Sequence, residues 1–399
     1  MTAVLPHQTR TMPAAARRAL PDRTLSAHAG GKIGIAPRFA VADADDLARV
    51  YTPGVGHAAT AIARDPERVW DLTIRRNAVA ILTNGTAVLG LGDIGPRAAL
   101  PVMEGKALLC KTLGGINAYP ICVDAPTVDE LVAVATAIAP TFGAINLEDV
   151  AAPMCFAVER RIRDTLDVPV FHDDQHGTAT VVAAALRNAA RVVGRSLADL
   201  QVAIVGAGAA GTATTELLLA LGVGDVVVVD RHGILHPQRP GIDARKHDLA
   251  RRTNRAGRRG DLECALRGAD VLIGVSRPSI VRPEWLATMR HHAIVFALAN
   301  PVPEVMPDAA PSNVAIFATG RSDHPNQINN VLAFPGMLRG LLDGGARRVD
   351  LATSAAAAIA LADLVPPDDL GPHHIVPSPF DARVVPTVAR AVQRATTHR

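Results

Sequence analysis

The sequence of 399 residues is poor in aromatic side chains, at 3%, and its 41 basic and 38 acidic groups leave a formal charge of only +3. Few aromatic rings and no cationic excess argue against binding to nucleic acid. No run of about 18 apolar residues occurs, which argues against a membrane span. The first twenty residues have no continuous apolar stretch, so we expect no secretory signal and a cytoplasmic protein.

Cysteine and lysine are also scarce. The four cysteines share no tight spacing, as expected of reduced thiols in a cytosol. Only Lys32, Lys106, Lys111 and Lys246 are lysines, and the other 37 basic groups are arginines. Lysine can release its proton whereas arginine cannot, so a retained lysine is a candidate for proton transfer. For any one of them alone, chance retention is the simpler interpretation.

Hydrophobic residues, by contrast, reach 49%, which is enough for a large core. Residues 1–29, rich in Ala, Arg and Pro, are expected to form a loose tail. Two units follow, over residues 30–166 and 167–399, and in both of them short apolar runs alternate with helical patterns. This alternation predicts an α/β fold with a doubly wound parallel sheet. We expect strands at 78–84, 168–171, 201–205, 225–230, 269–276, 293–301 and 314–320, and helices at 103–115, 128–143, 177–195 and 349–364.

The second unit contains a glycine motif in a specific context. The motif follows the apolar run 201–205, opens a helical stretch, and consists of Gly206, Ala207, Gly208, Ala209, Ala210 and Gly211. Asp230 ends the next apolar run, at about the spacing of 20 residues that is typical of a dinucleotide-binding fingerprint. Such a turn places pyrophosphate against backbone N–H groups at a helix N-terminus. Asp230 would bond a ribose hydroxyl, which favours NAD, whereas Arg231 could instead meet the 2′-phosphate of NADP.

Acidic residues gather at two further expected strand ends. Glu148 and Asp149 form one pair, and Asp173 and Asp174 form the other, just before a helix. Such an oxygen-rich group suits Mg²⁺ or Mn²⁺. For the second pair, capping of the helix N-terminus explains the residues about equally well. The neighbouring histidines at 172 and 176 are interpreted as turn residues, because no zinc-type spacing supports a zinc site.

Tyr51 and Lys106 are candidates for acid–base chemistry. Tyr51, one of two tyrosines, precedes a Pro-Gly turn, and Lys106 follows a glycine-rich segment. Such a pair can exchange protons when burial or neighbouring charges shift the pKa of the lysine. Taken alone, Tyr51 is more often a half-buried aromatic residue and Lys106 a surface cation, and their spacing does not change this interpretation.

Six segments together resemble one family. They are YTPGV, GLGDIGPRAALPVMEGKALL, NLEDVAAPMCF, FHDDQHGTA, FALANPVPE and ATGRSDHPNQINNVLAFPG, in this order. The chain is similar to the short bacterial malic enzymes, which are decarboxylating malate dehydrogenases, from about Gly30 to about Val388. The resemblance implies an N-terminal malic-enzyme catalytic domain and a Rossmann-like dinucleotide-binding domain. The acyltransferase-like C-terminal extension of some relatives is not expected.

The resemblance also implies roles for individual residues. Tyr51 would be the general acid and Lys106 the general base, with Asp173 tuning Lys106. The implied metal ligands are Glu148, Asp149 and Asp174, and the implied amides for the substrate carboxylate and the nicotinamide side are Asn300 and Asn329. The implied cofactor-binding residues are the segment from Gly206 to Gly211, Asp230, Arg231 and Asn300. Two departures from the family pattern are Val88, where long members carry an arginine, and His57 after the YTPGV segment.

The implied reaction is oxidative decarboxylation of (S)-malate to pyruvate and CO₂. It would require Mg²⁺ or Mn²⁺ and NAD, with NADP possible, and the implied assembly is a homodimer. Two alternatives stay open. One is a malolactic-type conversion of malate to lactate, and the other is a catalytically inactive dinucleotide-binding regulatory protein.

Overall fold

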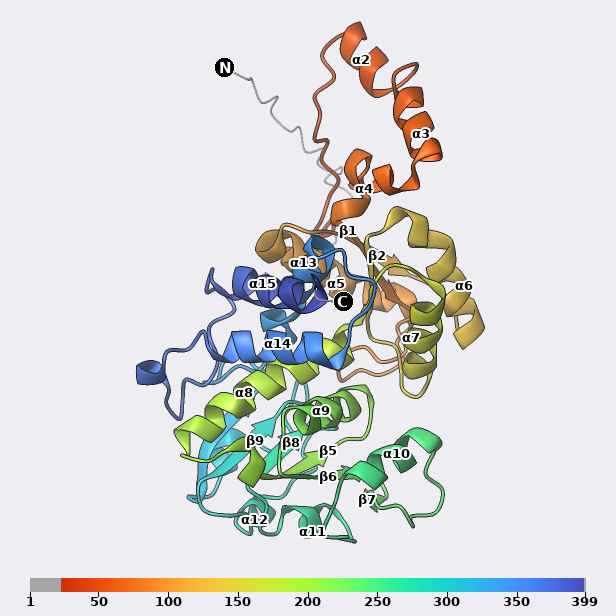
Figure 1. Cartoon of the computed structure of the whole chain (residues 1–399). Helices are drawn as coiled ribbons and strands as arrows, with labels where there is room; N and C mark the ends of the chain where they lie inside the picture. Colours follow the sequence, from red (N-terminus) through yellow and green to blue (C-terminus); the bar gives the residue numbers. More distant parts are fainter. Residues whose placement is uncertain (1–22, 398–399) are drawn as a thin grey trace.

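The strands of the protein form two sheets, described for residues 23–397 in a computed structural model (Figure 1). The first sheet is entirely parallel and has the order β2-β1-β3-β4. Its strands are β1 Ala78–Thr83, β2 Asn117–Cys122, β3 Ala144–Leu147 and β4 Val170–His172. The helices that connect these strands are α5 Gly95–Gly114, α6 Val128–Ile138 and α7 Met154–Thr165. The first unit is therefore a series of strand–helix–strand crossovers.

The second sheet has the order β10-β9-β8-β5-β6-β7, and only the short β7 runs antiparallel to its neighbour. Its strands are β5 Gln201–Val205, β6 Asp225–Asp230, β7 Gly233–Ile234, β8 Val271–Gly274, β9 Ala293–Ala297 and β10 Val314–Thr319. Its helices are α9 Ala209–Ala220, α10 Ala244–Arg252, α11 Leu262–Leu266 and α12 Pro283–Leu286. The strands that follow β5 lie on both sides of it: β6 and β7 on one side, and β8, β9 and β10 on the other. The sheet is therefore doubly wound.

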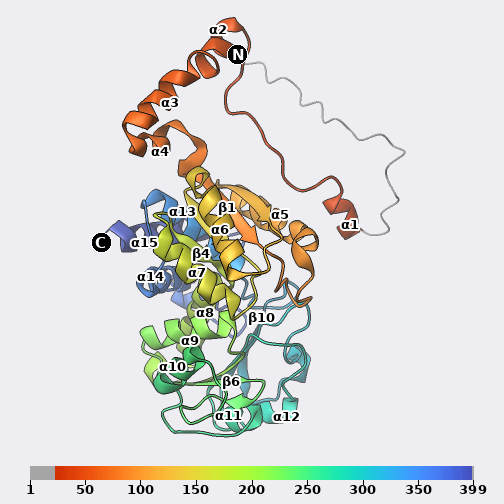
Figure 2. The ribbon, with the colours of Figure 1, turned by 90° about the vertical axis from the view of Figure 1, so that its right-hand side faces the viewer.

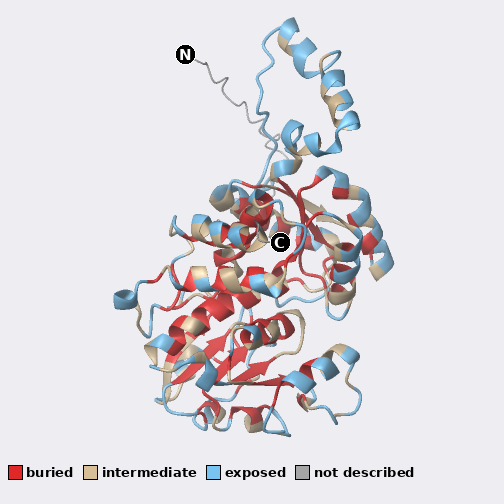
Figure 3. Cartoon of the chain, viewed as in Figure 1, coloured by how far each residue is buried: buried red, intermediate tan, exposed pale blue. Residues whose placement is uncertain are grey.

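Helix α8, Thr178–Val192, lies at the centre of the molecule between the two sheets (Figures 1 and 3). Most of this Ala- and Val-rich helix is buried, and only the side that carries Arg187 and Arg191 reaches the surface. The largest core cluster joins residues of β1 and α5 to residues of β5, β8 and β9 through α8. Three C-terminal helices complete this layer: α13 Phe334–Asp343, α14 Leu351–Ala362 and α15 Val384–Thr397. The two sheets therefore share one core.

The predicted α/β class and the doubly wound parallel sheet are confirmed. The expected boundary at residue 166 falls before β4, yet β4 pairs with β3 in the first sheet. The expected strands did not include β2 or β3. Pro120 interrupts β2, which tolerates this proline at the edge of the sheet, and β3 is only four residues long. Helix α5 begins at Gly95, earlier than the expected 103, and continues through Pro101.

The N-terminal segment forms an arm that stands away from both sheets (Figures 1 and 2). Most of the expected loose tail, residues 1–22, lies outside the described residues. The arm consists of α2 Ala44–Val50, α3 Val55–Arg64 and α4 Val69–Leu72, with short turns between them. The preceding helix α1 Arg23–His28 lies beside α5, and an extended segment leads from it to the arm (Figure 2). No residue from Arg23 to Asn77 is buried (Figure 3). The arm therefore contributes nothing to the core of its own chain.

Candidate active site

Four carboxylates follow the ends of two neighbouring strands. Glu148 and Asp149 come after β3, and Asp173 and Asp174 come after β4. Because the last residues of these parallel strands pair with each other, their carboxyl ends lie at the same edge of the sheet. One ligand oxygen from each of Glu148, Asp149 and Asp174 lies within 4.8 Å of the others. The three residues nominated as metal ligands are thus brought together.

Asp149 and Asp173 carry features that fit a bound cation. Asp149 has a positive φ of 52°, a strained conformation for a residue with a side chain. Its Oδ2 atom and Oδ1 of Asp173 are buried and have no hydrogen-bond partner among the described residues. Burial, and next the charge of Asp174, raise the pKa of Asp149 to about 7. This excess of negative charge and these unpaired oxygens fit a hard divalent cation such as Mg²⁺ or Mn²⁺.

Lys106 lies beside the acidic cluster, in the middle of α5, and is 8% exposed. Its Nζ atom donates to Oε1 of Glu148 at 2.5 Å and also contacts Oδ2 of Asp173. The ammonium group lies 4.6 Å from the centre of the Phe334 ring. Burial by itself would lower the pKa of Lys106, but Asp173 and Glu148 together raise it above its usual value. The lysine is therefore buried with two carboxylates as partners and is not a surface cation.

Two asparagines that sequence reasoning missed complete this group. Asn330 lies in a short turn before α13, and its Nδ2 donates to the same Asp173 oxygen that contacts Lys106. Asn146, the third residue of β3, donates to Oε2 of Glu148 at 2.8 Å. The sequence indicated only an asparagine-rich segment near Asn330, and nothing in it distinguished Asn330 from its neighbour.

The two nominated asparagines lie differently. Asn329 uses its side-chain oxygen to accept from the backbone N–H of Val331 at 3.0 Å, so it caps the turn. Asn300 is exposed and precedes Pro301 in a cis peptide bond. The side chain of Asn300 lies against Gly320, where an added Cβ would come within 2.9 Å of its Nδ2. Asn300 thus belongs to the loop after β9, at the carboxyl edge of the second sheet.

Tyr51 is not brought to Lys106 within one chain. It follows α2 in the protruding arm and is 66% exposed (Figures 1 and 2). The turn around it is tight, because a Cβ at Gly54 would approach the carbonyl oxygens of Arg49 and Ala48 to 2.5 and 2.6 Å. Large apolar side chains around the turn are exposed as well, including Leu47 and Val55. The nominated acid and base therefore lie apart.

The glycine turn has the shape that a dinucleotide requires. Gly206 has a φ of 117°, and a Cβ there would meet the carbonyl oxygen of Val275 at 2.4 Å. A Cβ on Gly211 would meet the oxygen of Gly206 at 1.7 Å, so only glycine allows α9 to pack this closely. Around Gly208 nothing lies within 4 Å of such a Cβ, which leaves open space in front of the helix N-terminus. The turn therefore fits pyrophosphate.

Asp230 ends β6, and its carboxylate is fully engaged by cations. Arg239 donates to both oxygens, at 2.9 and 2.6 Å, and Nζ of Lys246 lies 2.8 Å from Oδ2. These hydrogen bonds outweigh burial and lower the pKa of Asp230. Arg231 points to its neighbour His232, with a distance of 3.0 Å between Nε and Nε2. The carboxylate nominated for the ribose is therefore paired with two basic groups that the sequence did not associate with it.

A cleft connects the parts of this site. It is lined by the turn of Gly206 to Gly208, by Asp230 with its cationic neighbours, and by residues of α7 and of the turn after β4. Across it, the guanidinium of Arg245 on α10 lies 3.5 Å from the centre of the Phe156 ring on α7. The cleft thus runs from the dinucleotide turn to Gln175 and His176, the two residues that follow Asp174. Within residues 23–397, no helix has the length and apolarity needed to cross a bilayer.

Comparisons with known proteins agree with this geometry. Residues 31–163 match the malic enzyme N-terminal domain, and residues 175–397 match the malic enzyme NAD-binding domain. The NAD-dependent malic enzyme of Geobacillus stearothermophilus is 50% identical over 94% of this chain and 78% of its own length. The bifunctional malic/malolactic enzyme of Bacillus subtilis is 46% identical over 92% of this chain and 90% of its own. Other matched relatives are named NADP-dependent malic enzymes.

A solved structure is also similar. The NAD-dependent malic enzyme of Thermotoga maritima superposes with a TM-score of 0.89 at 44% identity, over 93% of this chain and 99% of that one.

Proposed function

The chain belongs to the malic enzyme family, and from this premise we propose that it converts (S)-malate to pyruvate and CO₂ with reduction of NAD or NADP. One observation carries the proposal: a buried lysine contacts the acidic cluster at the edge of the first sheet, and a dinucleotide turn opens on a cleft that reaches Gln175 and His176, the residues that follow Asp174. Such a complete set of groups has no use in an inactive dinucleotide-binding protein, so that alternative is not favoured.

Glu148, Asp149 and Asp174 would hold a divalent cation, and Mg²⁺ or Mn²⁺ fits their oxygen atoms. Bound there, the cation supplies positive charge to substrate oxygens, and a nicotinamide held at the glycine turn supplies the hydride acceptor. The chain itself positions these groups. Asn146 fixes one oxygen of Glu148, and the backbone N–H of Asp149 fixes one oxygen of Asp174. The ligand set is thereby oriented before substrate arrives.

Lys106 would take the proton of the substrate C2 hydroxyl. In the arrangement described here its two carboxylate partners keep the amine protonated, because they raise its pKa. Glu148 is both a partner of Lys106 and a candidate metal ligand. When Glu148 binds the cation, it attracts the ammonium group of Lys106 less strongly, so the lysine releases its proton more readily. Asp173 remains in contact with the lysine and, held in turn by Asn330, keeps Lys106 in place.

Tyr51 would deliver a proton to C3 after decarboxylation, and we propose that the tyrosine of a second copy does so in a homodimer. Two features support this assignment. The arm that carries Tyr51 has no buried residue, and its apolar side chains Leu47, Val50 and Val55 are 50%, 38% and 45% exposed. Such exposed apolar surface is typical of a partner interface. A symmetric dimer would let each arm reach the other chain's site.

We propose NAD as the preferred cofactor, with NADP accepted. Asp230 favours the ribose hydroxyl of NAD, and its charge would repel a 2′-phosphate. Arg239 and Lys246 offset that repulsion, because both already contact the carboxylate. The expected preference is therefore modest.

The reaction takes place in the cytoplasm in this proposal, with the small-molecule substrate as partner and with neither nucleic acid nor membrane involved. The nearly balanced charge and the four free cysteines support this location.

One assay tests the proposed function. Purified full-length protein is mixed with Mn²⁺, L-malate, and NAD or NADP in parallel, and reduced nicotinamide, pyruvate and lactate are measured. We expect equal amounts of reduced nicotinamide and pyruvate, and none without the metal. Lactate without net reduction of the cofactor would indicate the malolactic reaction instead. The absence of all three products with either cofactor would refute the proposal.

A further inference from the structure

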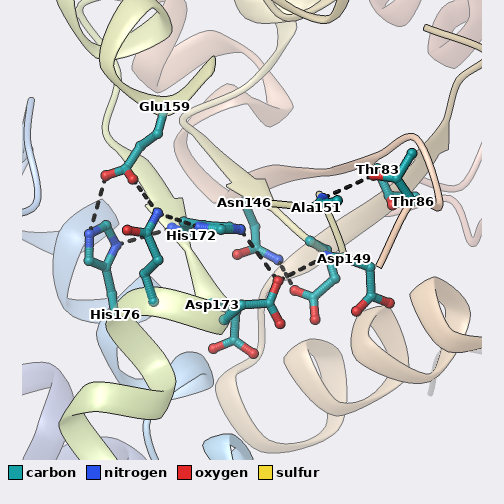
Figure 4. A network of polar contacts seen from close by, with 12 residues as sticks. Thr83, Thr86, Asn146, Asp149, Ala151, Glu159, His172, Asp173 and His176 are labelled. Atoms are coloured by element: carbon teal, nitrogen blue, oxygen red, sulfur yellow. Dashed lines mark hydrogen bonds and ion pairs between the residues drawn. The ribbon is translucent and has the colours of Figure 1, made fainter. Parts of the chain in front are cut away.

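A chain of buried polar groups leads from helix α7 to the acidic cluster (Figure 4). It begins at Glu159 on α7, passes through Gln175 and His172, and ends at Asp174. Glu159 is 8% exposed, Gln175 is 3% exposed and His172, the last residue of β4, is fully buried. Sequence reasoning interpreted this histidine as a turn residue. Its contacts indicate a more specific role.

The first hydrogen bonds in this series have a direction that follows from which groups can donate and which can accept. A carboxylate can only accept hydrogen bonds, so Glu159 requires the amide nitrogen of Gln175, and this Nε2 donates to Oε2 of Glu159 at 2.5 Å. The second hydrogen of Nε2 points to Nδ1 of His172, also at 2.5 Å. Nδ1 must therefore accept, which places the proton of the neutral ring on Nε2.

The last contact in the series is between His172 and Asp174, one of the candidate metal ligands. Nε2 of His172 lies 3.3 Å from Oδ2 of Asp174, within ion-pair distance, and it makes no hydrogen bond to any other group of the described residues, nor one of regular geometry to Asp174. The same Oδ2 accepts from the backbone N–H of Asp149 at 3.0 Å. Two nitrogen atoms thus lie beside one oxygen of Asp174. The other oxygen is left for a ligand.

We propose that His172 is a positioning residue that holds Asp174 in its metal-binding orientation, and that Glu159 fixes the direction of the hydrogen bonds through Gln175. This inference rests on the metal site proposed above. It gives a reason for a buried glutamate that neither binds substrate nor lies among the nominated ligands. Partners behind a metal ligand typically change metal affinity by about 10–100-fold when they are replaced.

His176 supports the same arrangement from the other side. Its Nδ1 accepts from the backbone N–H of His172 at 3.1 Å, so its proton is on Nε2, 3.3 Å from Oε1 of Glu159. Both oxygens of Glu159 are thereby engaged. Any change at Glu159 should consequently act on Asp174 through Gln175 and His172, without direct contact.

The test compares two substitutions of one side chain. His172→Gln can place an amide N–H near the position of Nε2, whereas His172→Asn reaches only the position of Nδ1. Mn²⁺ affinity is measured on the purified protein without substrate or cofactor, by the electron paramagnetic resonance signal of free Mn²⁺. We expect His172→Asn to weaken binding about 10–100-fold and His172→Gln to weaken it much less. Glu159→Gln should weaken it as well, because an amide facing Gln175 favours reversal of that side chain.

A matched control separates positioning from general loss of structure. Asn188 is also fully buried and polar, but it bonds the carbonyl oxygens of Ala362 and Ile375 and lies outside the chain of contacts. Asn188→Leu should lower the melting temperature and leave Mn²⁺ affinity unchanged. If His172→Asn does not fold, Glu159→Gln and His172→Gln still decide the question against this control.

Three results overturn the inference. They are equal losses of affinity in the two His172 variants, unchanged affinity in all of the variants at His172 and Glu159, and an equal loss of affinity in Asn188→Leu at a comparable decrease in melting temperature. A wild-type protein that binds no Mn²⁺ would instead refute the metal site itself. The two failures are therefore distinguishable.

Discussion

The exposed position of Tyr51 predicts that two chains complete each other's active sites, and mixed dimers test this. One mixed dimer combines a Tyr51→Phe chain with a Lys106→Arg chain. Arginine keeps the positive charge beside Asp173 and Glu148 but cannot act as a base. If each site takes Lys106 from one chain and Tyr51 from the other, one of the two sites keeps both native groups. If both groups come from one chain, neither site does.

The expected difference is large. Loss of a general acid or base typically costs about 10²–10⁴-fold in rate, so a homodimer of either variant should retain about 1% of wild-type kcat or less. The mixed dimer should reach about half, since one of its two sites is intact. Such dimers are obtained by coexpression with two different affinity tags and tandem purification. The initial rate of nicotinamide reduction with Mn²⁺ and L-malate is then measured for each preparation.

A second mixed dimer has the opposite expectation. It combines a wild-type chain with a chain that carries both substitutions. With sharing between chains, each site lacks one native group and activity should be about 1% or less. With both groups from one chain, the wild-type chain keeps a complete site and activity should be about half. Activity in the second dimer and none in the first would refute the assignment of Tyr51 to the partner's site.

Three further predictions concern single substitutions or one reagent. Asp174→Asn should weaken Mn²⁺ binding about tenfold or more, whereas Asp173→Asn should lower kcat more than affinity; equal affinity losses in a Mn²⁺ titration would contradict the separate roles. Asp230→Asn should free the side chains of Arg239 and Lys246 and shift the ratio of kcat/KM for NADP to kcat/KM for NAD about tenfold toward NADP, or about 1.4 kcal/mol. Steady-state kinetics with both cofactors measures this ratio. An unchanged ratio would show that Asp230 does not select the cofactor. Burial raises the pKa of Cys110 to about 12, so iodoacetamide at pH 8 should label Cys110 only after the protein is unfolded. Mass spectrometry measures the labelling, with the less buried Cys264 as internal control. Labelling of Cys110 in the native protein would contradict this prediction.

The acidic cluster could be predicted because it depends on local order along the chain. Glu148 and Asp149 directly follow one apolar strand, and Asp173 and Asp174 directly follow another. Once the strands are parallel neighbours, their ends meet, and so do the side chains that come next. The same reasoning applies to Gly206, which follows β5 immediately. In both cases the sequence carries the strand and the functional residue as one unit.

The arm and the hydrogen-bond chain could not be predicted, because they depend on which surfaces meet. The segment around Tyr51 has a clear turn motif, but nothing local to it says whether the turn packs on its own chain. Glu159 lies in α7 among charged residues and looks like part of a solvated helix face. Its burial results from the turn after β4, which brings Gln175 and His176 against it. Only the packing of α7 on that turn reveals the contact.

Asp230 shows how a correctly placed residue can still be misread. Its position at the end of β6 supports contact with ribose, and the sequence suggested that its negative charge sets the cofactor preference. The charge is shared with Arg239 and Lys246, nine and sixteen residues further along, which a loop and α10 return to the strand end. A bound 2′-phosphate would meet this group of three charges, whose sum is positive. Discrimination between NAD and NADP therefore depends on how firmly Asp230 holds its two partners, and this is the quantity that Asp230→Asn changes.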